Sequence, residues 1–292
     1  MDKKIRSGVF QRLTVVPAIL IIIGIMMYPI LHNFYISLRY VTLVNLKTNG
    51  IYVGLDNYIT LFKDEAFIAS MWTTLQYVVV TVIIQVIIAF ILGMMTYRRR
   101  TTLRKVTTIS LILPKMITPA AAALIWRFML NYETGIVNYF LTVLNFPKIA
   151  FLTNPSTAMA TLNVIAVWQN IGFTYLLILS GLMAMSYEVI EASMVEGANF
   201  INRLRYIVVP TLKPVLTVVS LFAIINAFQT FDSIYMTTGG GPGGTTQVAS
   251  IFLYRKLFMS SQIGMAASIS VILMIIGFMI SILLIKALRR RD

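Results

Sequence analysis

Six apolar stretches, each long enough to cross a lipid bilayer as a helix, constrain the fold of this chain more than any other feature of its sequence. A helix needs about 20 apolar residues to span the hydrocarbon core of a membrane. Hydrophobic residues make up 58% of the chain and charged residues only 12%, whereas a soluble domain carries about 25% charged residues. We therefore predict an all-α polytopic membrane protein with six transmembrane helices within residues 13–285. The six stretches lie near residues 13–36, 71–96, 106–130, 157–183, 213–237 and 263–285.

Proline residues interrupt or border two of these stretches. Pro114 and Pro119 fall in the third stretch, and Pro214 lies at the start of the fifth. Because proline removes a backbone hydrogen bond and its ring clashes with the preceding turn, we expect kinks at these positions.

The distribution of lysine and arginine predicts the orientation of the helices. Sixteen of the 24 basic residues lie in residues 1–12, in the loops after the second and fourth stretches, or in the tail 286–292. The three opposite loops carry six, and the remaining two fall within the third stretch. Because basic residues accumulate on the cytoplasmic side of membrane proteins, both termini are predicted to be cytoplasmic. This distribution accounts for the net charge of +14 without a nucleic acid as partner.

Composition excludes several classes of site. The chain has no cysteine, so disulfides, thiolate metal ligands and cysteine nucleophiles are absent. Its one histidine, His32, and its ten acidic residues give no pattern of metal ligands. The glycine run at 239–244 lacks the lysine of a phosphate-binding loop. We therefore expect no catalytic residues, no metal site and no ATP hydrolysis by this chain.

The loop after the fourth stretch is too long and too patterned for a simple connection. Residues 185–214 read MSYEVIEASMVEGANFINRLRYIVVPTLKP. Ser186 can cap a helix whose first turns carry glutamates, and Gly197 can end that helix in a left-handed conformation. A second amphipathic helix is predicted from about Asn199, with Pro210 as its end. Two ordered short helices on the cytoplasmic face are typical of a binding element.

This loop resembles the "EAA loop" of binding-protein-dependent ABC importer permeases. The family's pattern is Glu-Ala-Ala, three residues, Gly, about nine residues, an apolar residue and Leu-Pro. The chain departs from it with Ser193 for the second alanine, Glu196 where aspartate is commoner, and Val209 for leucine. The residues that carry the resemblance are Glu191, Ala192, Ser193, Glu196, Gly197, Ile207 and Pro210.

The resemblance implies that this segment is a coupling helix that docks in a cleft of a separate cytoplasmic ATPase. The alternative is an amphipathic helix that lies on lipid. Residues 186–197 carry three glutamates and no lysine, which disfavours contact with anionic headgroups. The residues implied to contact the ATPase are Glu191, Ala192, Ser193, Glu196 and Gly197.

Further segments are similar to the carbohydrate-uptake branch of the same family, the maltose and multiple-sugar type. They are YVGLDNY at 52–58, WRFM at 126–129 and TGGGP at 238–242. With them, the resemblance covers nearly the whole chain. It implies a type I ABC importer permease fold in a bacterial cell membrane, forming half of the translocation pathway for a sugar or oligosaccharide.

The resemblance also implies partners. They are a second homologous permease in a heterodimer, two cytoplasmic ATPase subunits that bind ATP and Mg, and an extracytoplasmic solute-binding protein. No cofactor is expected on this chain. One alternative is the same architecture with glycerol phosphates or another polar solute as cargo. Another is a secondary transporter, which would need midplane carboxylates and repeated halves that the sequence does not show.

Polar and aromatic residues of the fourth and fifth stretches are candidates for the substrate pathway, because polar groups inside a membrane are costly. Aromatic rings can stack on the C–H faces of a sugar while amides bond its hydroxyls. Gly172 and Tyr175 also match the segment that lines the sugar pocket in maltose-type permeases. Hydrogen bonding between helices is the alternative role for the whole set. The candidates are Trp168, Gly172, Tyr175, Asn226, Gln229, Thr230, Phe231 and Asp232.

Lys115 and Asp232 are charged residues of the third and fifth stretches. The helical rise of 1.5 Å per residue separates them by roughly 14 Å across the membrane. We therefore expect no ion pair between them and place Asp232 near the outer interface.

Overall fold

The computed structural model describes residues 2–48, 50–98 and 101–289. Arg99, Arg100, Arg290 and Arg291, on which the predicted orientation partly rests, lie outside these residues. The described chain is mostly helical and divides into two compact units. One comprises the chain up to Ile68 together with Leu253–Ile275, and the other comprises Ala69–Phe252 and the chain from Ile276.

The first unit joins long helices through a small β-hairpin. It contains α1 (Asp2–Ser37), β1 (Arg39–Tyr40), the 3-10 turn η1 (Leu46–Thr48), β2 (Ile51–Tyr52) and α2 (Asp56–Lys63). It also contains the π-helical turn η3 (Arg255–Met259) and the first half of α13 (Ile263–Arg289). The strands pair antiparallel with Arg39 opposite Tyr52.

Buried amides and hydroxyls fix this hairpin in place. The Asn57 amide donates to the carbonyl oxygens of Ser37 at 2.8 Å and Arg39 at 2.9 Å. The Ser268 hydroxyl donates to the same Ser37 carbonyl at 2.9 Å. A Cβ added at Gly264 would overlap the Arg39 carbonyl oxygen, so only glycine allows α13 to approach this closely.

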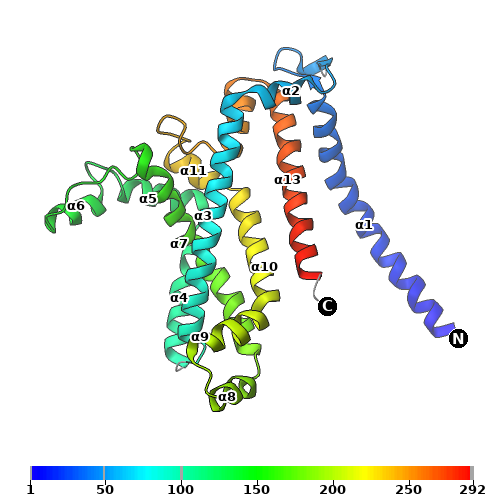
Figure 1. Ribbon diagram of the computed structural model, residues 1–292. Helices are drawn as coiled ribbons and strands as arrows, with labels where there is room; N and C mark the ends of the chain where they lie inside the picture. The colour runs from blue at the N-terminus through cyan, green and yellow to red at the C-terminus, as the bar shows by residue number, and fades with distance from the viewer. Residues whose placement is uncertain (1, 49, 99–100, 290–292) are drawn as a thin grey trace. The chain divides into compact units, whose positions relative to one another are not determined.

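The second unit is a helical bundle built around α7 (Pro155–Ala184). Figure 1 shows α3 (Glu65–Thr96), α4 (Thr101–Met116), α7 and α10 (Val209–Phe228) running side by side. Buried polar residues join α3 to α7, including the Thr81 hydroxyl, which donates to Asn163 Oδ1 at 2.8 Å. The remaining helices are α5 (Pro119–Met129), α6 (Ile136–Val143), α8 (Tyr187–Val195), α9 (Phe200–Arg203), η2 (Leu204–Val208), α11 (Asp232–Thr237) and α12 (Ala249–Tyr254).

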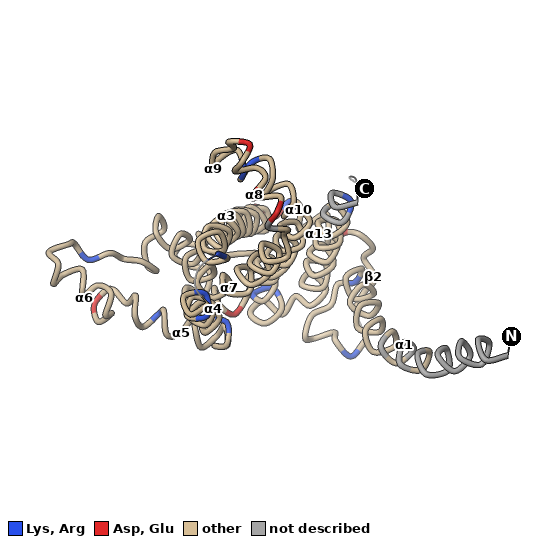
Figure 2. Tube along the Cα trace, turned by 90° about the horizontal axis from the view of Figure 1, so that it is seen from below, with Lys and Arg blue, Asp and Glu red and all other residues tan. Residues whose placement is uncertain are grey.

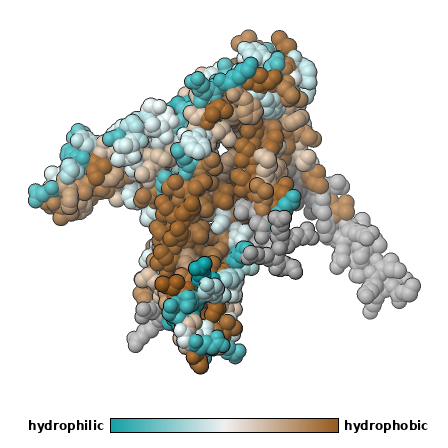
Figure 3. Space-filling view, viewed as in Figure 1, coloured by the Kyte–Doolittle hydropathy of each residue, from teal (hydrophilic) through white to brown (hydrophobic). Residues whose placement is uncertain are grey.

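Length and apolar composition allow four of the described helices to cross a membrane, or five if one bent pair counts as a crossing. The four are Glu65–Thr96, Pro155–Ala184, Phe200–Phe228 and Ile263–Leu283. Figure 3 shows hydrophobic surface over the middle of the second unit's helices and hydrophilic surface beyond their ends. The predicted stretch 13–36 falls within α1, and the structure does not describe the side chains at the start of this stretch.

The predicted third span is not one continuous helix. The pair α4 and α5 is bent by 98°. Pro114 lies in the last turn of α4 and Pro119 begins α5, while the Thr118 hydroxyl caps α5 by accepting from Ala121 N at 3.4 Å. Sequence alone predicted a kink here, and the break is closer to a right angle.

The predicted fifth span, 213–237, is also divided. Helix α10 ends at Phe228, residues 229–231 are not helical, and α11 begins at Asp232. A broken helix leaves backbone groups without helical partners. The Ser250 hydroxyl satisfies one of them by donating to the Thr230 carbonyl at 2.6 Å.

The prediction that Pro210 ends the second loop helix is wrong. The chain is helical from Phe200 to Phe228, because the π-helical turn Leu204–Val208 shifts the hydrogen-bond register just before the proline. Val209 N bonds Leu204 O across this turn, and Pro210 sits in the first turn of α10, where it needs no N–H donor.

Candidate functional site

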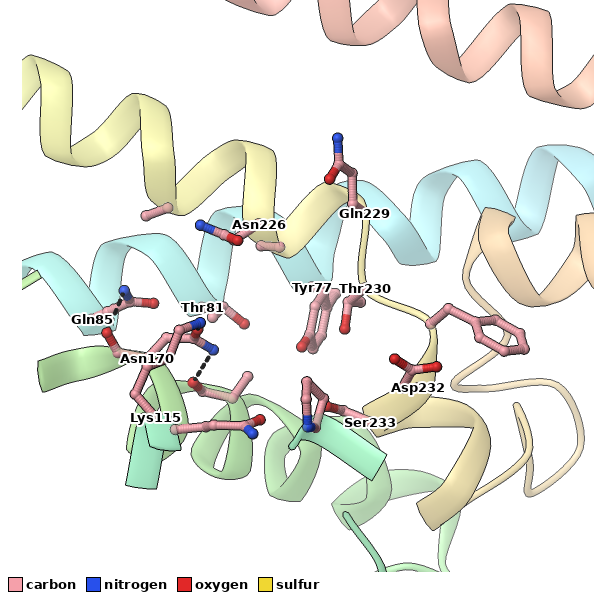
Figure 4. A pocket seen from close by; sticks show the side chains of 16 residues that line it. Tyr77, Thr81, Gln85, Lys115, Asn170, Asn226, Gln229, Thr230, Asp232 and Ser233 are labelled. Carbon is pink, nitrogen blue, oxygen red and sulfur yellow. Dashed lines mark hydrogen bonds between the residues drawn. The ribbon is translucent and has the colours of Figure 1, made fainter. Parts of the chain in front are cut away.

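A polar cavity of about 210 Å³ lies inside the second unit, beside the breaks between α4 and α5 and between α10 and α11. Figure 4 shows the side chains around it, which come from α3, α4, α7 and the α10–α11 region. Polar residues dominate a lining that is set within strongly apolar helices. The lining residues are Tyr77, Thr81, Gln85, Lys115, Pro119, Ala166, Gln169, Asn170, Ala223, Asn226, Ala227, Gln229, Thr230, Phe231, Asp232 and Ser233.

The break between α10 and α11 supplies one wall. Asn226 lies in the last turn of α10, and its amide nitrogen donates to Phe222 O at 2.9 Å, so its Oδ1 is oriented away from the helix backbone. Gln229 and Thr230 follow in the non-helical turn, and Asp232 begins α11. Helix α11 packs against α5, where Arg127 donates to Met236 O at 3.2 Å.

Helix α7 supplies the opposite wall and bonds the α4–α5 break. The Gln169 amide donates to the carbonyl of Ile117 at 3.2 Å, which is a backbone group released by that break. The Asn170 Oδ1 accepts from Lys115 Nζ at 2.6 Å, while its amide nitrogen donates to Ala166 O at 2.9 Å. Two amides of α7 therefore hold the end of α4 beside the cavity.

Helix α3 contributes a wall that the sequence analysis missed. Tyr77, Thr81 and Gln85 lie at intervals of four residues along one face of α3. The Gln85 amide donates to the Thr174 hydroxyl and at 3.4 Å to Asn170 O. The sequence does carry a signal for it, because Gln85 is a single polar residue between apolar neighbours in VIIQVII.

Five of the eight predicted pathway residues line this cavity, namely Asn226, Gln229, Thr230, Phe231 and Asp232. Asp232 therefore shares a cavity with Lys115, which we did not expect. As predicted, Lys115 does not bond Asp232 and donates instead to Asn170.

The other three predicted pathway residues pack between helices and do not line the cavity. Trp168 stacks edge-to-face on Trp126, with ring centroids 5.4 Å apart. A Cβ added at Gly172 would overlap the Leu111 carbonyl oxygen, so this glycine allows α4 and α7 to touch. Tyr175 is fully buried, with its hydroxyl 2.8 Å from the Thr96 hydroxyl.

The loop 185–214 forms α8 followed by a sharp turn. Gly197 has φ of +81°, which confirms the predicted left-handed stop. Ala198 N bonds Ser193 O at 2.9 Å and Gly197 N bonds Met194 O at 3.1 Å, a Schellman motif. Ser186 occupies the predicted capping position, but its side chain makes no capping hydrogen bond.

Helix α8 exposes most of the residues that the resemblance assigns to ATPase contact. Glu191, Ala192, Glu196 and Gly197 are exposed. Ser193 is instead buried and donates to Ile190 O at 2.7 Å, so it faces the rest of the unit. Four of the five predicted contact residues are thus available to a partner.

The cavity can bind a polar solute but shows no arrangement for covalent catalysis. Its amides and hydroxyls offer both donors and acceptors, and Tyr77 and Phe231 add aromatic faces. Among the described residues, no group of three or more histidine, cysteine, aspartate or glutamate residues could hold a metal ion.

Comparison with protein families gives one match over most of the chain. A family described as the binding-protein-dependent transport system inner membrane component matches residues 85–291. The trehalose/maltose transport system permease protein MalF of Thermococcus litoralis is 31% identical over 292 residues, covering 98% of this chain and 97% of that protein.

Two other relatives are named for anionic solutes. The sulfoquinovosyl glycerol transport system permease protein SmoG of Agrobacterium fabrum is 28% identical and covers 96% of this chain and 90% of that protein. The sn-glycerol-3-phosphate transport system permease protein UgpA of Yersinia enterocolitica is 29% identical, with coverage of 82% and 81%.

The fold matches a solved structure of a bacterial ABC transporter involved in the import of the acidic polysaccharide alginate. The TM-score is 0.84 at 20% identity, over 99% of this chain and 98% of that chain. A second structure, of the alginate transporter with its pentasaccharide-bound periplasmic protein, gives a TM-score of 0.81 at 20% identity, over 97% and 94%. The mostly helical fold is therefore that of an ABC importer permease.

Proposed function

Because this chain belongs to the family of binding-protein-dependent transport system inner membrane components, we propose that it forms half of an ATP-driven import pathway for a sugar or oligosaccharide. Members of this family are the permeases of such systems, so the chain is a transport component and not the ATPase. The polar cavity at the break between α10 and α11 carries the proposal about the solute.

The chemistry of the lining suits a neutral sugar. Amides such as those of Gln85, Asn226 and Gln229 can bond several hydroxyls at once, and Phe231 can cover an apolar C–H face. Lys115 and Asp232 carry opposite charges, so the lining as a whole is close to neutral. A neutral polyol satisfies these groups without bringing an uncompensated charge into the membrane.

A second candidate is an anionic solute, and Lys115 favours it. Its ammonium group bonds the uncharged amide of Asn170, which leaves its positive charge available to a sulfonate, phosphate or carboxylate group. Relatives named for sulfoquinovosyl glycerol and glycerol 3-phosphate support this alternative. Asp232 in the same lining opposes it through like-charge repulsion.

The proposal includes six membrane crossings within residues 13–285. The bent pair α4–α5 serves as the third crossing, and α10 with α11 as the fifth. Residues 1–12, the loop 185–214 and the tail 286–292 are assigned to the cytoplasm. The excess of basic residues in these segments and in the loop after the second stretch supports this orientation.

Helix α8 is proposed as the coupling helix. Its outward residues Glu191, Ala192, Glu196 and Gly197 provide a short acidic surface with small side chains at its centre. A compact helix of this kind fits a groove on another protein. In the assembled importer this groove belongs to an ATPase subunit, which binds ATP and Mg.

The proposed assembly contains this chain, a second homologous permease, two ATPase subunits and an external solute-binding protein in a bacterial cell membrane. Dependence on a binding protein follows from the family. The second permease is included because this chain supplies only part of the pathway wall. The ATPases are included because this chain has no phosphate-binding loop.

Uptake by reconstituted vesicles tests the proposal. The complete assembly should import labelled neutral oligosaccharide when ATP and the binding protein are present, and this chain alone should not. Asn226→Ala and Gln229→Ala should lower uptake about tenfold, since each removes hydrogen bonds to the solute. Thr217→Ala is the matched control, because Thr217 lies on α10 outside the cavity and donates to its own helix at Lys213 O.

Two results would contradict the proposal. ATP-dependent uptake by the lone chain would remove the need for partners. Normal uptake by both cavity variants, with Thr217→Ala equally active, would show that the polar cavity is not the solute pathway.

A further inference from the structure

A second cavity, of about 390 Å³, lies between the end of α3 and the segment from α8 to η2. It shares no lining residue with the polar cavity. Its walls are largely apolar, with Met94 and Met95 from α3, Met194 from α8 and Phe200 from α9. None of the residues proposed above for the solute pathway or for contact with the ATPase lines this cavity.

Two arginines line the same cavity, and its described lining includes no carboxylate. Arg98 extends from the end of α3 and lies over the Tyr97 ring at 5.6 Å. Arg203 ends α9 and is half-buried. A half-buried guanidinium among apolar side chains favours an anionic group beside it, because the planar fork can bond two oxygens at once.

The acidic residues of α8 do not lie beside Arg203 in the cavity. Glu188, Glu191 and Glu196 are exposed, and none of them lines the cavity. Figure 2 shows the acidic positions on α8 and basic positions next to them at α9. Within this loop the three glutamates are exposed outside the cavity, whereas Arg203 is half-buried and lines it.

The cavity combines the two features of an amphiphile-binding site. One part is apolar and rich in methionine, whose flexible side chain adapts to acyl chains of different length. The other carries the exposed Arg98, just beyond the end of α3, and the half-buried Arg203 of α9. Helix α3 is long and apolar enough to cross the membrane. Basic pockets at the cytoplasmic ends of membrane helices bind anionic lipid headgroups.

We propose that this cavity binds one anionic phospholipid, with its phosphate between Arg98 and Arg203 and the start of its acyl chains against Met94, Met95 and Met194. The proposed orientation of the chain places the site in the cytoplasmic leaflet, and in this respect alone the inference rests on the proposed function. The lipid lies behind α8, so it fills the space between the coupling loop and the membrane helices.

Retention of lipid by the assembled importer tests the site. The complex is exchanged into detergent, incubated with phosphatidylglycerol or with phosphatidylcholine of the same acyl chains, and the bound lipid is counted by native mass spectrometry. Wild type should retain phosphatidylglycerol and not phosphatidylcholine. Arg203→Gln should weaken retention about fivefold, and the double variant with Arg98→Gln further, since a basic residue near the surface contributes about 1 kcal/mol.

Arg205→Gln is the matched control, because Arg205 lies two residues further along the same helix, is exposed and does not line the cavity. It should retain lipid as wild type does. Arg203→Lys, which keeps the charge, should retain more lipid than Arg203→Gln, and this comparison separates binding from misfolding. Addition of millimolar inorganic phosphate should not displace the lipid.

Three results would overturn the proposal. Equal loss in the Arg203→Gln and Arg205→Gln variants would indicate general surface attraction. Unchanged retention in the double variant would place the lipid elsewhere. Displacement by inorganic phosphate would indicate a site for a free anion. Because lipid retention is measured without transport, each of these results leaves the proposed import function to its own test.

Discussion

Lys115 Nζ lies 2.6 Å from Asn170 Oδ1, which ties the last turn of α4 to the middle of α7 beside the polar cavity. The other end of the same amide donates to Ala166 O, so its orientation is fixed by its own helix. A positive charge is thereby held in the cavity by a neutral partner. A neutral solute does not need this positive charge, whereas an anionic solute would bind to it directly.

Replacing Lys115 with glutamine removes the charge and keeps a donor for Asn170. For the proposed neutral sugar, the initial rate of uptake in vesicles should stay within about threefold of wild type, because a neutral hydrogen bond contributes only about 1 kcal/mol. Lys213→Gln, at an exposed position outside the cavity, serves as the control. A loss of more than about tenfold would favour the anionic solute, since bonds to charged groups contribute about 1.5–3 kcal/mol.

Replacing Gly197 with aspartate should block both uptake and the stimulation of ATP hydrolysis by the binding protein. The residue needs φ of +81°, which costs a branched residue about 1 kcal/mol or more, and the new acid adds to the acidic outer surface of α8. We expect membrane insertion at normal levels, with uptake and binding-protein-stimulated ATPase activity reduced at least about tenfold. Both are measured on the reconstituted complex.

Gly244→Asp is the matched control for this variant. Gly244 has φ of +82°, and a Cβ added there, as at Gly197, meets nothing within 4 Å. The two substitutions therefore impose the same local strain and add the same charge at different sites. Equal activity of the two variants would mean that the α8 turn has no special part in coupling.

Replacing Gly172 with alanine should destabilise the contact between α4 and α7. The added Cβ overlaps the Leu111 carbonyl oxygen, and rigid backbone can move away only at a cost of about 1–3 kcal/mol. The thermal midpoint of the purified complex should fall by several degrees. Gly277→Ala, in α13 with open space around it, should leave the midpoint unchanged or raise it, because alanine favours a helix over glycine. A matching fall in both variants would contradict this packing role.

Single cysteines report the orientation of the chain, which has no cysteine of its own to interfere. Val44→Cys, at a position 97% exposed, should react with an impermeant maleimide added to intact cells. Asn202→Cys, at an exposed position in α9, should react only after permeabilisation. Labelling of Asn202→Cys from outside would reverse the proposed orientation.

The family was predictable from sequence because its motif is local. The run from Glu191 to Gly197 needs only a short helix and a left-handed stop, and both follow from neighbouring residues. The match of the family over residues 85–291 confirms that resemblance. The inward position of Ser193 was not predictable, because it depends on how α8 rests on the rest of the unit.

The cavity was only partly predictable because its walls meet through tertiary structure. Gln229, Thr230 and Asp232 were predicted because they are polar residues in an apolar stretch. The helix break beside them was not predictable, because no proline or glycine lies there. The position of Tyr175 outside this cavity was not predictable for a related reason. A buried tyrosine bonded to Thr96 and one that contacts a solute have the same local sequence pattern.

The helix that runs unbroken from Phe200 to Phe228 is about 40 Å long at 1.5 Å per residue. One end begins at the turn after α8, and the other carries Asn226 into the polar cavity. A continuous helix of this kind can pass a displacement from one end to the other, although the π-helical turn Leu204–Val208 and Pro214 interrupt its regular hydrogen bonding. The first joint comes after Phe228, at residues 229–231. If α8 is the coupling helix, a movement of α8 imposed by the ATPase would be passed along this helix to Asn226 and Gln229, at its far end. ATP-driven movement would then change the hydrogen bonds that these residues make with the solute.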